Sequence, residues 1–398
     1  MTPNLARSGN GAANYTFGVE VEFFAAMNFE VFRHTKFEDL RQLIGQRIAE
    51  LKPHELPVTV PATKDLEEDE KTGTDYGKWT VTQDTSIEPD DETAFDYYEC
   101  QCVELISPIY WLHGSHWRDH FRAIFSPNKR GATRDPEMYL EVNTSAHLHV
   151  HVGLADRGLS FRTIRNLAIL VIIFEKEVDK VLADHMGYVN ETTWAKSHVH
   201  NPAFKGRSLE GKCLEIWKCK RTQEIIDTMC PIPPNVPDEN DPSWRRLYKY
   251  NFMSLASSKR TIEFRQHEGT LNAEEMVHWV QFVTSLVGLA HAIEDDDLKS
   301  LILHNTLESG LPVNISDLLV FLHVISDAPL PLDTVTFFAR KAAARGAHVK
   351  TRSRTNIRGH PQGSLIFPWL KATKSDEKEA EQRAAHSLKA FASGTEKQ

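Results

Sequence analysis

The sequence predicts an α+β protein in which helices cover one face of a curved antiparallel sheet and leave its polar face open. Four segments alternate apolar and polar residues with the period of two that is typical of β-strands. These segments are Phe17–Phe24 (FGVEVEFF), Tyr97–Pro108 (YYECQCVELISP), Leu140–Gly153 (LEVNTSAHLHVHVG) and Thr261–Arg265 (TIEFR). Two long helical segments, Ser160–His185 and Asn272–Ile293, are apolar enough to be buried against the sheet.

The first of these strands carries two glutamates on its polar face. Glu20 and Glu22 would lie about 7 Å apart, opposite the apolar residues of the same strand. At an effective dielectric constant of about 20, their repulsion costs on the order of 2 kcal/mol. Two interpretations are open for this strand alone. It is either a solvated edge strand, or one wall of a site in which a cation or an arginine compensates the charge.

The remaining elements follow from helical spacing and from turn residues. Trp79–Asp84 is expected to pair with Tyr97–Pro108 in a hairpin with a long acidic connection. The region Asn190–Pro242 is rich in His, Gly and Pro and is expected to be irregular apart from one short helix. The predicted shorter helices are Phe37–Leu51, Ser115–Ser126, Thr222–Met229, Ile315–Ile325 and Val335–Ala344.

Composition narrows the function classes. The chain has 398 residues, 41% of them hydrophobic, and a formal net charge of −9, which argues against a general nucleic-acid binder. The longest apolar run, Leu167–Phe174, is too short to span a membrane, and the first 14 residues contain no apolar signal-peptide core. Five cysteines without a CxxC pair predict no disulfide framework, and Cys100 and Cys102 are a weak zinc candidate. We therefore expect a protein of the reducing cytoplasm.

Acidic, basic and imidazole side chains fall on the polar faces of all four strands. Taken singly, each has an ordinary alternative, because a His-x-His-x-His strand also suits zinc or solvent and a Glu-x-Arg pair is commonly a surface ion pair. Together they predict a floor of carboxylates with imidazole, which suits Mg²⁺ or Mn²⁺, and an arginine that faces the phosphates held by such ions. The residues are Glu20 and Glu22, Glu104, His147, His149 and His151, and Glu263 and Arg265.

Four motifs, FGVEVEFF, CVELISP, HLHVHVG and RTIEFRQHEGT, occur in the order and rough spacing of the amidoligase family. The chain is similar to this family over about Asn14–Ile293. The family resembles glutamine synthetase and γ-glutamylcysteine ligase, the carboxylate–amine ligase superfamily. The resemblance implies a glutamine synthetase-like fold with helices on one face of the sheet and the active site on the other. Three parts of the chain are expected to lie outside the family core: a disordered N-terminus (1–13), an acidic insertion (53–78) and a helical C-terminal region (294–398).

The resemblance also implies a role for individual residues. Metal ligands would be Glu20, Glu22, Glu104, His149 and Glu263. Catalysis would involve Arg265, His151 and, as general base, Asp84, while the nucleotide would be bound by His151, Arg265, Asn251 and Tyr250. His147 adds a third imidazole to its strand, so which of the three histidines binds metal stays open.

The cofactors implied are ATP and Mg²⁺ or Mn²⁺. The γ-phosphoryl group would pass to a substrate carboxylate, an amine would attack the acyl phosphate, and phosphate would leave. Both substrates would be small molecules or peptides, and neither their identity nor the oligomeric state follows from the sequence. Two alternatives stay open: a metal-dependent amidase or hydrolase that uses the His/Glu cluster to activate water, and a non-catalytic nucleotide-binding relative. The lack of an HExxH motif and the arginine on the metal face favour the ligase.

The C-terminal region contains a basic stretch, 340–360. Two interpretations are compatible with the sequence of this stretch. It is either a binding segment for a polyanion or an acidic substrate tail, or a solvated loop.

Overall fold

The computed structural model describes residues 14–51, 57–60, 76–84, 86–87, 98–114, 116–125, 138–155, 157–186, 195–233, 236–238, 240–306 and 313–345. The α+β class is confirmed. The expected disorder of residues 1–13, most of the acidic insertion and the basic stretch after Arg345 lie outside the described residues.

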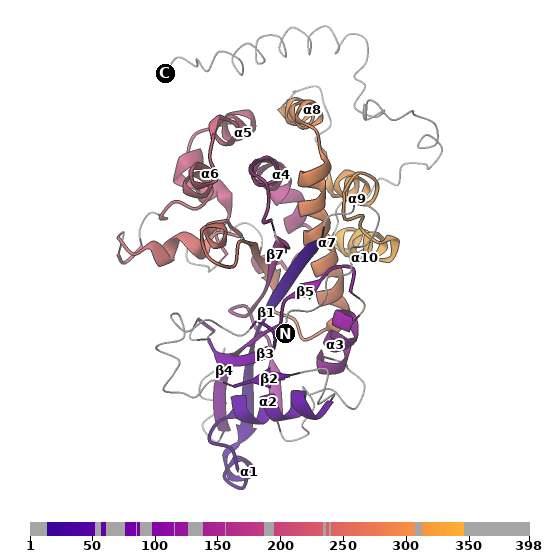
Figure 1. Ribbon diagram of the computed structural model, residues 1–398. Helices are drawn as coiled ribbons and strands as arrows, with labels where there is room; N and C mark the ends of the chain where they lie inside the picture. The colour runs from indigo at the N-terminus through magenta and orange to yellow at the C-terminus, as the bar shows by residue number, and fades with distance from the viewer. Residues whose placement is uncertain are drawn as a thin grey trace, which may run out of the picture.

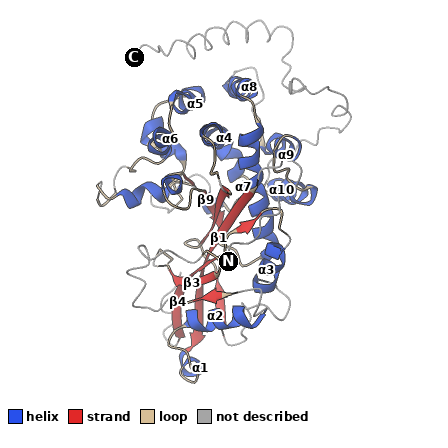
Figure 2. Ribbon diagram, viewed as in Figure 1, coloured by secondary structure: helices blue, strands red, loops and turns tan. Residues whose placement is uncertain are grey.

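In the described part of the chain, nine strands form one open sheet (Figure 2). The order across it is β2-β3-β4-β1-β7-β9-β8, and β5 and β6 also pair with β1. The β2–β3 pair is parallel and the other pairs are antiparallel. The strands are β1 (Tyr15–Asn28), β2 (Val58–Thr59), β3 (Trp79–Gln83), β4 (Tyr98–Ile106), β5 (Tyr110–Trp111), β6 (Met138–Glu141), β7 (His147–Leu154), β8 (Tyr250–Asn251) and β9 (Ile262–Glu268).

Strand β1 is long enough to pair with four others. Along one edge it pairs with β4 and then β5, and along the other with β7 and then β6. Its predicted alternation is confirmed, because Val19 and Val21 are fully buried on one face while Glu20 and Glu22 occupy the other. The predicted hairpin is confirmed too, since β3 pairs antiparallel with β4.

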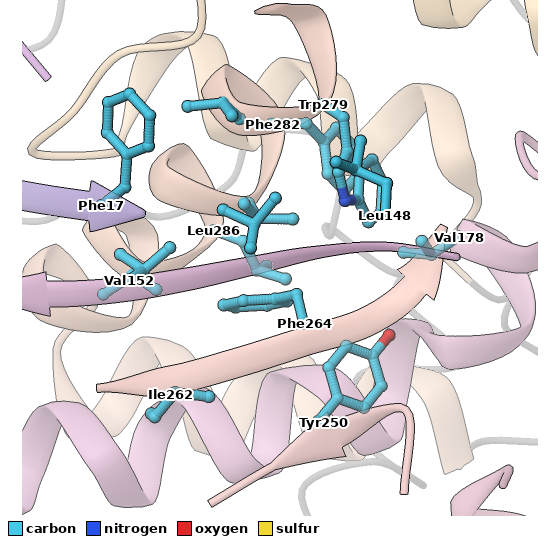
Figure 3. Packing of buried hydrophobic residues seen from close by; sticks show 14 of the residues in the cluster. Phe17, Leu148, Val152, Val178, Tyr250, Ile262, Phe264, Trp279, Phe282 and Leu286 are labelled. Carbon is cyan, nitrogen blue, oxygen red and sulfur yellow. The ribbon is translucent and has the colours of Figure 1, made fainter. Parts of the chain in front are cut away.

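Helices cover the apolar face of the sheet. α4 (Phe161–Asp179) packs on α7 (Ala273–Ala292), and α7 also contacts β7 and β1. Figure 3 shows side chains of the sheet gathered against this helix. The buried residues labelled there include Leu148, Val152, Ile262 and Phe264 of the strands and Trp279, Phe282 and Leu286 of α7.

Both long helices begin at the caps that the sequence indicates. The Ser160 hydroxyl accepts a hydrogen bond from the Thr163 amide at 3.1 Å, as an N-cap serine does. The Asn272 side chain accepts from the amides of Glu274 and Glu275. Glu275 does not complete a reciprocal capping box, because its carboxylate bonds to the Thr270 hydroxyl instead.

The shorter helices surround this core (Figure 1). One prediction was wrong, because residues 209–218 form a regular helix, α5, where we expected irregular chain; Ser208 caps it. Among the described residues no single helix is long and apolar enough to cross a membrane. The bent pair α7 and α8, with 114° between the two helices, has the length and apolar composition of a span when the two are taken together. The shorter helices are α1 (Phe29–Phe32), α2 (Leu40–Leu51), α3 (His116–Phe125), α5 (Leu209–Lys218), α6 (Thr222–Met229), α8 (Asp295–Thr306), α9 (Ile315–Val324) and α10 (Leu332–Ala344).

Helix α10 is tied to the sheet by a lysine at the start of the predicted basic stretch. The Lys341 ammonium group lies 3.1 Å from Oε1 of Glu268, at the end of β9, and also bonds to Glu275 of α7. Burial would raise the pKa of Glu268, but His267, Lys341 and the Ala183 amide lower it to about 2. The ionised carboxylate therefore stabilises the contact between α10 and the sheet.

We predict that Glu268→Gln lowers the free energy of unfolding at pH 7 by about 2–3 kcal/mol. The pKa of Glu268 is about 2 in the folded protein and 4.5 as the reference value, so its stabilisation is complete above pH 4.5 and is lost as the pH falls toward 2. Denaturant unfolding at several pH values should show the gap between wild type and variant narrowing below pH 4.5. Glu50→Gln, at an exposed pair with Arg47, is the control. A gap that does not change with pH would contradict the prediction.

Candidate functional site

Strand register gathers the predicted acidic and histidine residues on one face of the sheet. Directly opposed residues of antiparallel strands point to the same face. Glu20 lies opposite His149 of β7, and Glu22 lies opposite Glu104 of β4. Glu263 of β9 lies opposite His151 on one side and opposite Asn251 of β8 on the other. Five strands thus contribute to one polar floor, which lies opposite the helices of the core.

Glu20 is at the centre of this floor. Its Oε1 atom lies 3.0 Å from Nε2 of His151, and its Oε2 atom lies 3.4 Å from Nδ1 of His149. The same His149 nitrogen is 3.6 Å from Oε1 of Glu263. Ligand-type atoms of Glu20, Glu104 and His149 lie within 4.8 Å of one another, as do those of Glu20, His151 and Glu263. Glu20 therefore belongs to two adjoining groups of candidate metal ligands.

Glu22 forms a second part of the floor. Its Oε2 atom accepts a hydrogen bond of 2.8 Å from the His147 amide, and Nδ1 of His147 lies 3.3 Å from the same oxygen. Asp84, which follows β3, reaches this part because β3 pairs with β4. Ligand-type atoms of Glu22, Asp84 and Glu104 lie within 4.8 Å of one another. The hairpin thus delivers two acids to the site.

Glu263 is held by two partners on its own side of the floor. Arg265, on the same face of β9, contacts Oε1 of Glu263 at 2.5 Å, and Asn251 donates from Nδ2 to Oε2 at 2.6 Å. All three side chains are buried. The arginine is therefore a fixed positive charge at the floor, within two residues of a candidate metal ligand.

Two carboxylates of the floor stay ionised. Burial would raise the pKa of Glu20, but contacts with His151 and His149 hold it well below its ordinary value. Burial acts in the same direction on Glu263, and Arg265 and His151 outweigh it and lower the pKa to about 2.

The other two carboxylates, Glu22 and Glu104, have raised pKa values. Burial raises the pKa of Glu22 to about 7, and the negative charge of Asp84 adds to the rise. Burial and the charges of Glu20, Asp84 and Glu22 hold the pKa of Glu104 well above its ordinary value. A cation bound between these groups would favour their ionised form and relieve the repulsion.

The donor set fits a hard divalent cation. It is mostly carboxylate oxygen with imidazole nitrogen, the ligand types that suit Mg²⁺ or Mn²⁺. The Nε2 atoms of His149 and His151 are buried, and each faces a carboxylate oxygen: Oε1 of Glu22 at 3.4 Å and Oε1 of Glu20 at 3.0 Å. Imidazole nitrogens that converge with carboxylates that repel one another form a donor set that a cation would satisfy. No cysteine occurs in the candidate metal groups of the described residues, so the Cys100 and Cys102 alternative gains no support.

The structure thus brings together nearly all the residues predicted for the site. Tyr250 is the exception. It lies opposite Phe264 in the β8–β9 pair, and its ring packs edge-on against Phe264 at 5.9 Å (Figure 3). Because Asn251 faces the floor, the preceding residue must face the core, and Tyr250 is fully buried there.

Sequence reasoning missed Lys259, whose Nζ atom lies 3.5 Å from Oε1 of Glu20. The lysine precedes β9 in a turn, so no strand alternation pointed to it. The one available signal was a basic pair, Lys259 and Arg260, immediately before the Glu-x-Arg strand.

We predict that Mn²⁺ raises the melting temperature of the wild-type protein, with a stabilisation of about 2.7 kcal/mol when the free ion exceeds its dissociation constant a hundredfold. Glu20→Gln should weaken Mn²⁺ binding by more than about tenfold, because Glu20 belongs to two ligand groups. Thermal denaturation across a Mn²⁺ titration measures both effects. Glu274→Gln, at an exposed ion pair with Arg122, should respond like wild type. Equal Mn²⁺ responses in Glu20→Gln and wild type would contradict this assignment.

The chain is similar to a known protein family. Residues 13–287 match the family described as "Putative amidoligase enzyme", and this match covers more than half of the chain and every residue of the floor. No curated protein matches the chain. The protein belongs to the amidoligase family.

Proposed function

We propose that this protein is an ATP-dependent ligase that joins a carboxylate to an amine through an acyl-phosphate intermediate. The observation that carries the proposal is the juxtaposition, on one buried floor, of a carboxylate–imidazole cation site with Arg265. Transfer of a phosphoryl group to a carboxylate brings two anions together, so the reaction needs concentrated positive charge. Family membership supports a ligase, and the floor supplies the groups for this particular chemistry.

A bound Mg²⁺ or Mn²⁺ would supply charge neutralisation at the nucleotide phosphates, with Glu20, Glu22, Glu104, His149 and Glu263 as its ligands. Arg265 would donate hydrogen bonds to the transferring phosphoryl group through its planar guanidinium. His151 lies beside Glu20 on the same floor, where it would bind a phosphate oxygen.

Two further residues have supporting roles. Asn251 orients the Glu263 carboxylate through its 2.6 Å hydrogen bond and borders the nucleotide site. Asp84 is the proposed general base that removes a proton from the attacking amine, since it follows β3 at the edge of the floor. The substrate carboxylate would attack the γ-phosphorus of ATP and release ADP. The amine would then attack the carbonyl carbon of the acyl phosphate and release phosphate, so no nucleophile of the protein is needed.

A metal-dependent amidase or hydrolase is the competing proposal, because a His/Glu cluster also suits a metal that activates water. Buried Arg265 in contact with Glu263 weighs against it, since a fixed cation beside the metal is useful for phosphate and lowers the affinity of the floor for Zn²⁺ alone. Metal analysis of the purified protein separates the two: stoichiometric zinc favours the hydrolase, and weak Mg²⁺ binding that strengthens with nucleotide favours the ligase.

We predict that phosphate release from ATP requires a carboxylate and an amine together, in a screen of amino-acid and polyamine pairs with Mg²⁺. Arg265→Lys should lower kcat/KM by at least about a hundredfold, because lysine keeps the charge but loses the planar guanidinium donor. Arg122→Lys, at the surface pair with Glu274, is the matched control. Wild-type turnover in a folded Arg265→Lys protein would contradict the assignment, and phosphate release without any amine would favour hydrolysis.

A further inference from the structure

Lys259 is held at the edge of the floor by a tight turn. The turn Ser257–Arg260 precedes β9, and the Ser257 hydroxyl accepts a hydrogen bond from the Lys259 amide at 3.2 Å. The Arg260 amide bonds back to the Ser257 carbonyl at 3.3 Å. Arg260 has φ +50°, a left-handed conformation that costs energy for a residue other than glycine. The surrounding contacts therefore fix the shape of this turn, and with it the point from which the Lys259 side chain starts.

The Lys259 ammonium group faces the acidic floor and an aromatic ring. It lies 3.5 Å from Oε1 of Glu20 and 5.7 Å from the centre of the Tyr76 ring. Burial would lower the pKa of Lys259, but Glu20, Tyr76 and Glu263 raise it, so the side chain stays charged. Its side chain is 34% exposed, whereas that of Glu20 is 13% exposed. The lysine therefore has an open path away from the floor, and the glutamate does not.

We propose that Lys259 couples cation binding to nucleotide binding, because it competes with the divalent cation for Glu20 and binds the nucleotide phosphates once it is displaced. This inference rests on the cation site and the ATP use of the proposed function. It assigns a role to a residue outside the strand motifs, and it predicts that the cation binds weakly alone and more tightly with nucleotide.

Competition follows from the shared Glu20 carboxylate. Glu20 belongs to both of the candidate ligand groups at the centre of the floor, so a cation held by either group contacts the carboxylate that Lys259 also contacts. A divalent cation and an ammonium group that contact the same carboxylate are close enough to repel each other strongly. The flexible, partly exposed lysine is the one that can move, since the ligand groups are fixed by the sheet.

Once the cation displaces it from Glu20, the Lys259 ammonium group can bind an anion that lies beside the cation. The phosphates of a nucleotide that share the cation with Glu20 must lie beside it, within reach of a side chain that starts from the adjoining turn. Phosphates are strong partners for lysine as a point charge. Nucleotide binding would then stabilise the displaced position of Lys259, which removes the competitor for the cation, and the two ligands would favour each other reciprocally.

Lys259→Met tests both halves of the inference. Mn²⁺ binding, followed by electron paramagnetic resonance of the free ion without nucleotide, should tighten by roughly two- to fivefold in the variant, because the competing charge is gone. Binding of the Mn²⁺ complex of the non-hydrolysable ATP analogue AMP-PNP, followed by calorimetry at saturating Mn²⁺, should weaken by a similar or larger factor. Tighter binding of Mn²⁺ alone together with weaker binding of the Mn²⁺–AMP-PNP complex would show that Lys259 moves from Glu20 to the phosphates. A general loss of structure would weaken both affinities.

Two controls define the outcome. Lys259→Arg keeps the charge and should leave Mn²⁺ binding close to wild type. Lys205→Met removes an exposed lysine that follows the helical turn Pro202–Phe204, outside the floor, and should change neither affinity. If Lys259→Met and wild type bind Mn²⁺ equally, or bind the Mn²⁺–AMP-PNP complex equally, the inference is overturned while the proposed ligase stands. If the wild-type protein binds no Mn²⁺ with or without AMP-PNP, both are overturned.

Discussion

The alternation of strand β1 is the constraint on which the rest of the structure depends. Val19 and Val21 are fully buried against the helices, so Glu20 and Glu22 must project from the opposite face. A slip of one residue would move both carboxylates into the apolar core, at a cost far above that of any single contact in the site. Because β1 is paired along both edges, its register also fixes where β4 and β7 present Glu104 and His149. Burial of apolar side chains on one face therefore builds the acidic floor on the other.

The floor divides its carboxylates into two kinds by environment alone. Glu263 is ionised because Arg265 and His151 lie beside it, and Glu20 because His151 and His149 do. Glu22 and Glu104 have raised pKa values because burial and neighbouring acids outweigh their partners. Carboxylates in adjoining positions with pKa values pushed apart are a common sign of a working site. The difference would also rank them as ligands of the proposed cation: the ionised pair would attract it first, and its arrival would favour ionisation of the other two.

Sequence predicted the parts of this site that follow from local periodicity. Strand alternation found Glu20, Glu22, Glu104, Glu263 and the histidines, since a strand of five or more residues shows which side chains share a face. It could not place Tyr250, because β8 has two residues and a period of two cannot be read from so short a strand. It could not find Lys259, whose position depends on the turn before β9. Helix α5 was missed for a related reason: Gly211 and the neighbouring Gly and Pro residues suggested irregular chain, and packing against α4 and α8 outweighs that local preference.

Helices α9 and α10, which lie beyond residue 287 where the family match ends, pack against α7, and α10 contacts the end of β9. Ser326 and Ala328 pack so closely on α7 that a Cβ atom at Gly288 would lie 2.4 Å from the Ser326 hydroxyl and 2.7 Å from the Ala328 amide. Farther along, Lys341 of α10 bonds to Glu268, which is three residues after Arg265 on β9. A strand that presents a buried arginine and glutamate to one face is thereby anchored at its end by an ion pair from α10. This ion pair supports β9, the strand that carries Glu263 and Arg265. Among the described residues, no side chain of α8, α9 or α10 belongs to the candidate metal groups of the floor.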